Sequence, residues 1–257
     1  MASYLLPIWA VFLISLVLLF LAIEGGFRVG NVFVKKTTQK AAPSVAVVVA
    51  AMLGLLAFLL AFMVNFAGGI FNERRQLVVE EVMAIETAYL QAGYIDEPYS
   101  TEAEDLLREY VDVRIALLEN SNTEGFQTRS RQIQEELWKS SKIIIRENPD
   151  PPTTLYISSI NEVINVYAQR VNAALGIRVP PVVLIVGFIV SMLTLFLVGM
   201  SSSYSEKRNI IAIIILVLVV WVVFALIVDL DRSQEGLLKV PQKAMIELQE
   251  WLNSGRI

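Results

Sequence analysis

The sequence predicts an all-α membrane protein, with four transmembrane helices and a helical-bundle soluble domain inserted between the second and third of them. The first reason is composition: 55% of the 257 residues are hydrophobic and only 18% are charged, whereas a soluble domain of this length usually carries more charge. The second reason is distribution, because the apolar residues concentrate in four blocks and leave one long polar stretch between the second and third blocks.

Each of the four apolar blocks has the length and character of a membrane-spanning helix. They cover residues 4–23, 44–66, 180–199 and 210–228, close to the roughly 20 residues that a helix needs to cross about 30 Å of hydrocarbon. None has Asp, Glu, Lys or Arg in its interior, where one charge costs at least about 2.5–3.5 kcal/mol. The alternative, four buried core helices of a soluble protein, fits such uniformly apolar blocks poorly. We expect the first block to be a retained membrane helix rather than a signal peptide, because no basic segment precedes it.

These blocks set the expected boundaries of the parts of the chain. Residues 1–71 hold two membrane helices and a basic cytoplasmic loop, and residues 180–228 hold the other two membrane helices. The soluble domain covers residues 72–179 and an amphipathic tail covers residues 229–257. The apolar positions of the tail predict a helix that lies on the membrane surface or covers the soluble bundle.

Two short basic segments predict the orientation in the membrane. One follows the first membrane helix and the other joins the third helix to the fourth. Because basic loops stay in the cytoplasm, we expect the N-terminus, the soluble domain and the C-terminus on the outer side of a bacterial inner membrane. The basic residues concerned are Arg28, Lys35, Lys36, Lys40, Lys207 and Arg208.

The soluble domain is acidic. It contains 18 acidic and 11 basic residues, a net charge of −7, while the rest of the chain has a net charge of +3. An acidic domain beside a membrane pore would concentrate cations and repel anions. The alternative for most of these charges is an ordinary solvated helix surface.

The same domain follows a helical pattern. Val78, Val82, Ile85 and Tyr89 form one apolar stripe, so the second membrane helix should continue unbroken to about residue 92. Further helices are expected at 101–119, at 127–147 after a turn at 121–125, and from the prolines at 149–152 to about residue 176. These helices predict a small bundle.

Small and polar residues share one face of the second membrane helix, at spacings of three and four. Such a face either lets membrane helices pack closely or lines a path for ions, and both hold if the helix packs around an oligomer axis. A shorter stripe occurs on the third membrane helix. The candidate pore-lining residues are Gly54, Ala57, Ala61, Asn65, Gly68, Asn72, Ser191 and Thr194.

Charged residues near the membrane boundaries are candidates for ion binding or gating. Asp229 and Asp231 follow the fourth membrane helix, where two carboxylates either bind a cation or pair with Arg74 or Arg75. The full set is Glu73, Arg75, Glu80, Glu81, Asp229, Asp231 and Arg232. The identity of any metal ion stays open.

Catalysis has little support in the sequence. The chain has no Cys and no His, so thiolate chemistry and the commonest general base and metal ligand are excluded. No nucleotide-binding or nucleophile motif occurs, and we expect no cofactor. A hydrolase built on Asp229, Asp231 and Glu80 lacks a metal-site pattern. Nucleic-acid binding lacks a basic patch with aromatic residues between the charges.

Several short strings resemble a known family. They lie at residues 71–75, 80–81, 87–90, 106–111, 161–164, 178–181, 229–232 and 236–237. Together they resemble the bestrophin-like domain family of bacterial integral membrane proteins, from the second helix to the tail. The resemblance implies kinship with bestrophins, which are pentameric chloride channels, and it implies no catalytic or binding residues. The acidic domain departs from the charge that suits an anion channel.

Two functional hypotheses follow. The leading one is a homo-oligomeric ion channel that favours cations and whose pore is lined mainly by the second membrane helix. Its partners are the lipid bilayer, further copies of the chain and inorganic ions. The alternative is a non-conducting sensor or scaffold whose outer bundle binds a ligand or partner.

Overall fold

A computed structural model describes residues 7–34, 42–119, 123–204, 208–232 and 236–254. Across these ranges the chain forms α-helices and no β-strand, which confirms the predicted all-α class. The helices are α1 (Ile8–Val34), α2 (Ala42–Ala92), α3 (Tyr99–Glu119), α4 (Thr123–Glu147), α5 (Pro151–Leu175), α6 (Pro181–Ser202), α7 (Ile210–Asp231) and α8 (Lys243–Asn253).

Four of these helices, α1, α2, α6 and α7, are long and apolar enough to cross a membrane. They cover residues 8–23, 44–66, 181–199 and 210–228 of the four predicted blocks, which agrees with a multi-pass membrane protein. The helix α2 runs without a break from Ala42 to Ala92, as the apolar stripe predicted. The expected turn at 121–125 is wrong in its described part, because α4 already begins at Thr123. Some predicted features lie outside the described residues, namely the start of that turn at 121–122 and the basic residues Lys35, Lys36, Lys40 and Lys207.

The chain divides into two compact units. Unit 1 comprises Met1–Asn72 and Ile177–Lys239, and unit 2 comprises Glu73–Gly176 and Val240–Ile257. Unit 1 therefore holds α1, α6, α7 and the first part of α2, and its helices carry the four apolar blocks. Unit 2 holds the second part of α2 together with α3, α4, α5 and α8.

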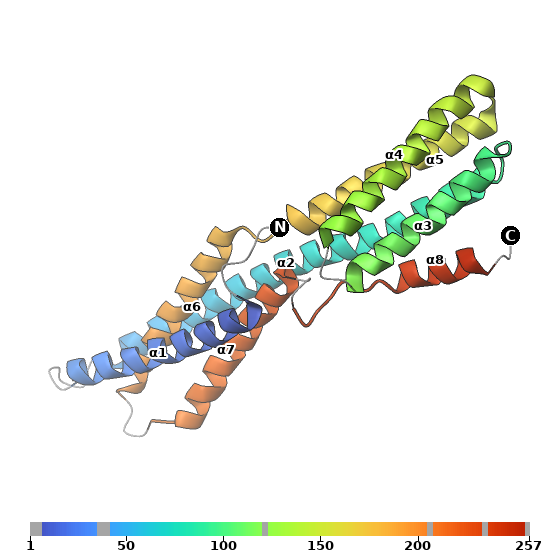
Figure 1. Ribbon diagram of the computed structural model, residues 1–257. Coiled ribbons are helices and arrows are strands. Elements are labelled where there is room, and N and C mark those ends of the chain that lie inside the picture. The colour runs from blue at the N-terminus through green and yellow to red at the C-terminus, as the bar shows by residue number, and fades with distance from the viewer. Residues whose placement is uncertain (1–6, 35–41, 120–122, 205–207, 233–235, 255–257) are drawn as a thin grey trace. The chain divides into compact units, whose positions relative to one another are not determined.

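In unit 1, α1 and α6 pack with their backbones in direct contact (Figure 1). A Cβ atom added at Gly26 would lie 1.9 Å from the carbonyl oxygen of Phe196, and one added at Gly199 would lie 2.0 Å from that of Ile23. A Cβ at Gly30 would lie 2.3 Å from the Ser203 hydroxyl oxygen. Only glycine fits at these positions, since small residues let membrane helices approach this closely.

The helix α7 completes unit 1. Its Trp221 indole donates a 2.9 Å hydrogen bond to the carbonyl oxygen of Phe12 in α1, and Phe224 packs on Phe188 of α6 with ring centroids 5.0 Å apart. At the other end of the unit, Glu24 of α1 accepts hydrogen bonds from Arg28 (3.3 Å) and Arg208 (2.8 Å). Arg28 and Arg208, one basic residue from each of the two basic segments, therefore lie at the same end of unit 1.

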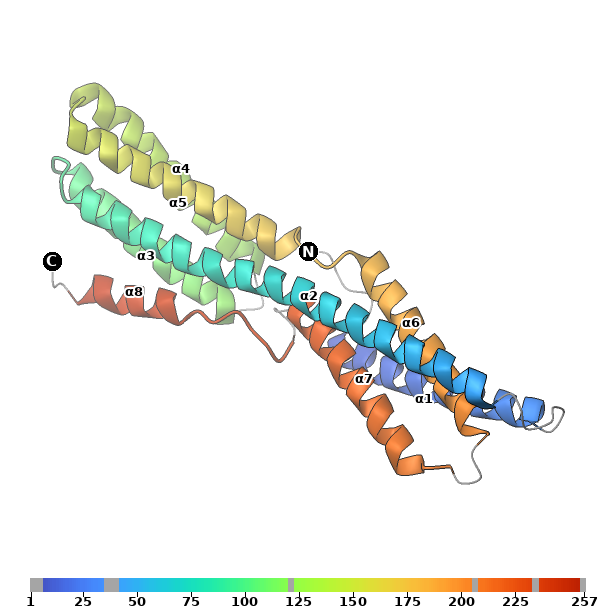
Figure 2. The ribbon, with the colours of Figure 1, turned by 180° about the vertical axis from the view of Figure 1, so that it is seen from behind.

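Unit 2 is a helical bundle with its own core, seen from behind in Figure 2. Ile85, Leu107, Ile133 and Ile160 contribute fully buried side chains from α2, α3, α4 and α5. The helix α5 starts at Asp150, whose carboxylate accepts a 2.8 Å hydrogen bond from the backbone N–H of Thr153, a typical N-cap.

The tail helix α8 packs against this bundle. Met245, Leu248 and Leu252 are buried in the core of unit 2, and Gln249 donates a 2.6 Å hydrogen bond to Asp112 of α3. Of the two predicted placements of the tail, the structure therefore supports the one that covers the bundle, because the apolar face of α8 is already buried.

Gly25 and Gly26 offer a matched test of the contact between α1 and α6. An added Cβ at Gly25 meets its nearest neighbour, the Phe196 ring, at an ordinary 3.8 Å. We expect Gly26→Ala to destabilise the protein by about 1–3 kcal/mol through overpacking and Gly25→Ala to leave stability nearly unchanged. Thermal unfolding of both variants in detergent measures this difference. Equal unfolding temperatures for the two variants would contradict the close contact between α1 and α6 at Gly26.

Candidate functional site

The predicted pore-lining stripe lies on an exposed face of α2. Gly54, Ala57, Ala61 and Asn65 are all exposed in the single chain. Among the described residues, no atom outside the helix's own nearby backbone lies within 4 Å of a Cβ added at Gly54 or Gly68. The stripe is therefore accessible to whatever surrounds one copy of the protein.

The opposite face of α2 is buried. Leu56, Leu60, Met63, Ala67 and Ile70 belong to the core of unit 1. At 3.6 residues per turn these positions lie on average about half a turn around the helix from the stripe. The helix thus has one face for its own chain and one small-polar face that its own chain leaves uncovered.

Asn72 and Gly68 continue the stripe, and Asn72 is also exposed. The two candidates on α6 differ from these residues. Ser191 and Thr194 have no exposed surface, and their hydroxyls donate 2.8 Å hydrogen bonds to the carbonyl oxygens of Gly187 and Val190 in their own helix. These two side chains are interior packing residues of unit 1, while the stripe of α2 is open.

The charged candidates of α2 also separate into two environments. Glu73 and Arg75 are exposed, and Glu80 is half-buried and accepts a 2.8 Å hydrogen bond from Gln76 one turn earlier. Glu81, in contrast, has no exposed surface. The same helix therefore presents solvated charges and one charge in the interior of unit 2.

Glu81 is held by two arginines and a tyrosine. One carboxylate oxygen lies 3.0 Å from Nε of Arg114 and accepts a 2.8 Å hydrogen bond from the Tyr110 hydroxyl. The other oxygen accepts hydrogen bonds from Arg114 (3.2 Å) and from Arg170. Burial and the neighbouring Glu81 charge raise the pKa of Tyr110 well above its usual value, so its hydroxyl stays a donor.

This cluster connects most helices of unit 2. Tyr110 and Arg114 belong to α3 and Arg170 to α5. Gln134 of α4 donates a 3.2 Å hydrogen bond to the Tyr110 hydroxyl, and Arg170 donates a 2.7 Å bond to Gln242 just before α8. Such an arrangement is typical of a buried ion-pair network, in which each charge depends on the others.

The carboxylates after the fourth membrane helix are also buried and hold backbone groups. Asp229 accepts hydrogen bonds from the N–H groups of Leu237 (2.8 Å) and Leu238 (2.9 Å). A Cβ added at Gly236 would lie 2.2 Å from an Asp229 carboxylate oxygen, so a side chain there would force this carboxylate to move. Asp231 accepts a 2.7 Å hydrogen bond from the N–H of Val179, just before α6.

Asp231 therefore connects the end of α7 to the segment just before α6, and Asp229 holds the backbone of residues 237–238. The third charged candidate in this segment, Arg232, follows α7 directly. Within the described residues, no group of three or more acidic side chains has a geometry that could hold a metal ion. Arg74, one of the two arginines predicted as possible partners for these aspartates, donates a 3.0 Å hydrogen bond to the carbonyl oxygen of Ala173 in unit 2.

Sequence reasoning missed two features of the structure. The first is the set of glycines between α1 and α6, although the spacing of Gly26 and Gly30 is a small-x-x-x-small signal for helix packing. The second is the pair of arginines around Glu81. No local pattern could have found that pair, because Arg114 and Arg170 are 33 and 89 residues away from Glu81.

Comparison with known proteins identifies the family. A family model described as a bestrophin-like domain matches residues 17–245, nearly the whole chain. The chain belongs to the bestrophin-like domain family. Membership in the bestrophin-like family suggests a membrane channel-type protein. Neither the curated proteins nor the solved structures compared with this chain gave a match.

The match also gives a context for two strings noted in the sequence. The bestrophin-like match includes Asp229, Asp231 and Gly236. In the structure the two carboxylates accept hydrogen bonds from backbone N–H groups. Glu80 and Glu81 lie in the match too, and only Glu81 is buried.

Glu80 and Glu81 offer a second matched pair. Glu81→Gln removes the charge that compensates two buried guanidinium groups, and we expect it to destabilise the protein by about 3–5 kcal/mol. Glu80→Gln changes a residue bonded only within its own helix turn, and surface changes of this kind stay within about 0.5 kcal/mol. Chemical or thermal unfolding in detergent measures both. A Glu81→Gln variant as stable as Glu80→Gln would exclude the network as a source of stability.

Proposed function

We propose that the protein is a homo-oligomeric ion-conducting pore of the membrane. The observation that carries the proposal is the stripe from Gly54 to Asn72, which lies on the face of α2 that its own chain leaves exposed. A face of small and polar residues gains little from contact with lipid tails, but it suits a position beside other copies of the same helix around an axis. Membership in the bestrophin-like family supports a channel-type protein.

In this proposal α2 lines most of the path. Asn65 and Asn72 supply amide groups that replace part of the hydration shell of an ion, and Gly54, Ala57 and Ala61 leave room for its passage. Ser191 and Thr194 take no part in the lining, because their side chains are buried in unit 1.

The proposed pore favours cations. The support is the charge of residues 72–179, with 18 acidic and 11 basic residues, since a negative domain near a pore raises the local concentration of cations. Glu73 and Glu80 contribute exposed or half-exposed carboxylates close to the stripe in sequence. Glu81 does not add to this negative surface charge, because it is buried beside two arginines.

The proposed topology places residues 1–71 and 180–228 in the inner membrane and residues 72–179 outside the cytoplasm. The tail from residue 229 stays on the same outer side as the soluble domain. The supporting observations are the basic residues in the two short segments and the joint pairing of Arg28 and Arg208 with Glu24.

Ion flux tests the proposal directly. Purified protein in liposomes should pass K⁺ under an applied voltage. In a KCl gradient the reversal potential should lie close to the equilibrium potential of K⁺ rather than that of Cl⁻. Bilayers that show no current over a range of pH and Ca²⁺ concentration would count against conduction. A reversal potential close to the equilibrium potential of Cl⁻ would overturn the cation preference. A monomer or a dimer without a central axis would favour the sensor or scaffold function instead.

Ala61 and Phe62 test the lining. Both residues are exposed, but Ala61 belongs to the stripe and Phe62 lies further around the helix. Ala61→Trp should cut the flux to a small fraction of its original value, because the indole fills the path, while Phe62→Trp should leave most of it. Flux through liposomes with equal amounts of each variant measures this. Equal ion fluxes through the two variants would show that this face of α2 does not line the path.

A further inference from the structure

Two exposed leucines follow the last of the apolar helices. Leu237 has 90% of its surface exposed and Leu238 has 41%, and Leu237 is the most exposed large hydrophobic residue in the described part of the chain. Both residues belong to unit 1, as does α7. Single exposed leucines are common in soluble proteins, so exposure alone does not show whether this pair meets water or lipid.

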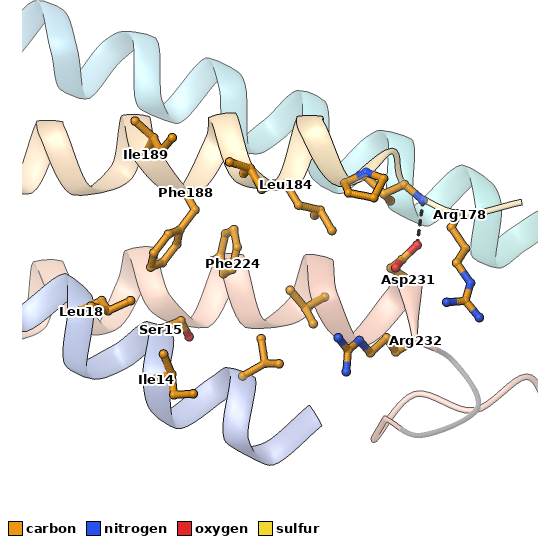
Figure 3. Close-up of a pocket in the computed structure, with 15 residues that line it drawn as sticks. Ile14, Ser15, Leu18, Arg178, Leu184, Phe188, Ile189, Phe224, Asp231 and Arg232 are labelled. Carbon is orange, nitrogen blue, oxygen red and sulfur yellow. Dashed lines mark hydrogen bonds between the residues drawn. The ribbon is translucent and has the colours of Figure 1, made fainter. Parts of the chain in front are cut away.

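The end of α7 marks a boundary of the apolar layer in unit 1. The apolar run of α7 ends at Val228 and is followed by Asp229. Asp231 accepts a 2.7 Å hydrogen bond from the N–H of Val179 (Figure 3), two residues before α6 starts at Pro181. One long apolar helix therefore ends at the level where another begins. For two helices that are long and apolar enough to cross a membrane, this shared level is where the hydrocarbon meets the polar interface.

The backbone of the two leucines is attached at this level. The Asp229 carboxylate accepts hydrogen bonds from the N–H of Leu237 at 2.8 Å and from that of Leu238 at 2.9 Å. The N–H of Gly236 donates a 3.0 Å hydrogen bond to the carbonyl oxygen of Arg232. Residues 236–238 therefore fold back onto the end of α7, and the side chain of Leu237 starts beside the first charged residue after the apolar run.

These hydrogen bonds suit surroundings that are poor in water. Asp229 is only 4% exposed, and each of its carboxylate oxygens accepts one backbone N–H. Backbone polar groups beside hydrocarbon need partners within the protein, because lipid tails supply none. The protein thus satisfies the N–H groups of both leucines internally and leaves only their apolar side chains to the surroundings.

We propose that Leu237 and Leu238 form a membrane anchor, in which both side chains enter the interfacial layer of the bilayer beside α7. Apolar side chains at this depth gain from contact with the acyl chains. Lipid surrounds every membrane span at this level, so the anchor needs no complementary protein surface. It fixes the point at which the chain leaves the bilayer on its way to α8. The anchor is independent of ion conduction, because it uses no residue of the stripe on α2.

Spin labels on single cysteines test the anchor in the full-length protein, reconstituted in phosphatidylcholine bilayers. The chain has no Cys, so Leu237→Cys and Leu238→Cys each carry one label. We expect both labels to collide more often with oxygen, which concentrates in lipid, than with a nickel chelate dissolved in water. Two exposed positions serve as references. Val219→Cys on α7 (55% exposed) reports on the hydrocarbon, and Leu155→Cys on α5 (57% exposed) reports on the surface of the soluble bundle.

The ratio of the two collision rates decides the outcome. At Leu237 we expect a ratio several-fold above that at Leu155 and closer to that at Val219. A ratio equal to that at Leu155 would place the pair in water and overturn the proposal. Low collision rates with both reagents would also overturn it, because protein, either a second copy or another part of the chain, would then cover the pair.

The methyl signals of the unchanged Leu237 provide a control for the label. A lipid that carries its nitroxide near the headgroup should broaden these NMR signals, and a gadolinium chelate in water should leave them sharp. The opposite result would show that the label, and not the leucine, enters the bilayer, and it would overturn the proposal as well.

Discussion

In a membrane the hydrophobic effect no longer drives one helix onto another, so unit 1 depends on van der Waals contact between α1 and α6. Gly26 and Gly199 let each helix touch the backbone of the other. This contact fixes both helices, and α7 then packs against them through Trp221 and Phe224.

The helix α2 follows a different rule. Its buried positions recur every three or four residues from Leu56 to Ile70 in the core of unit 1. Between Ala84 and Ala92 the same helix contributes to the core of unit 2, so one long helix belongs to both cores. A helix has a limited width of face to bury, and the remaining surface must meet lipid, water or another copy. Small and polar residues on that surface are a poor choice for lipid contact alone, and this is the physical basis of the proposal that α2 lies at an oligomer axis.

The sequence was sufficient for the parts of the fold that follow local rules. Hydrophobic length predicted the four membrane helices, and the stripe at Val78, Val82 and Tyr89 predicted the unbroken run of α2. The start of α4 was missed, because Gly125 and its polar neighbours resemble a turn, although the helix already begins at Thr123. Site residues were harder to interpret. Exposure separates Asn65 from Ser191 and Glu80 from Glu81, yet exposure depends on packing between distant segments and leaves no local pattern.

The Glu81 network has a consequence for how this sequence can change over time. A single substitution of Glu81, Arg114 or Arg170 leaves a buried charge without compensation, whereas joint replacement by apolar residues of similar volume is often tolerated in buried ion pairs. We therefore expect the three positions to change together. Relatives should keep all three or lose all three, and intermediates with one or two of them should be rare.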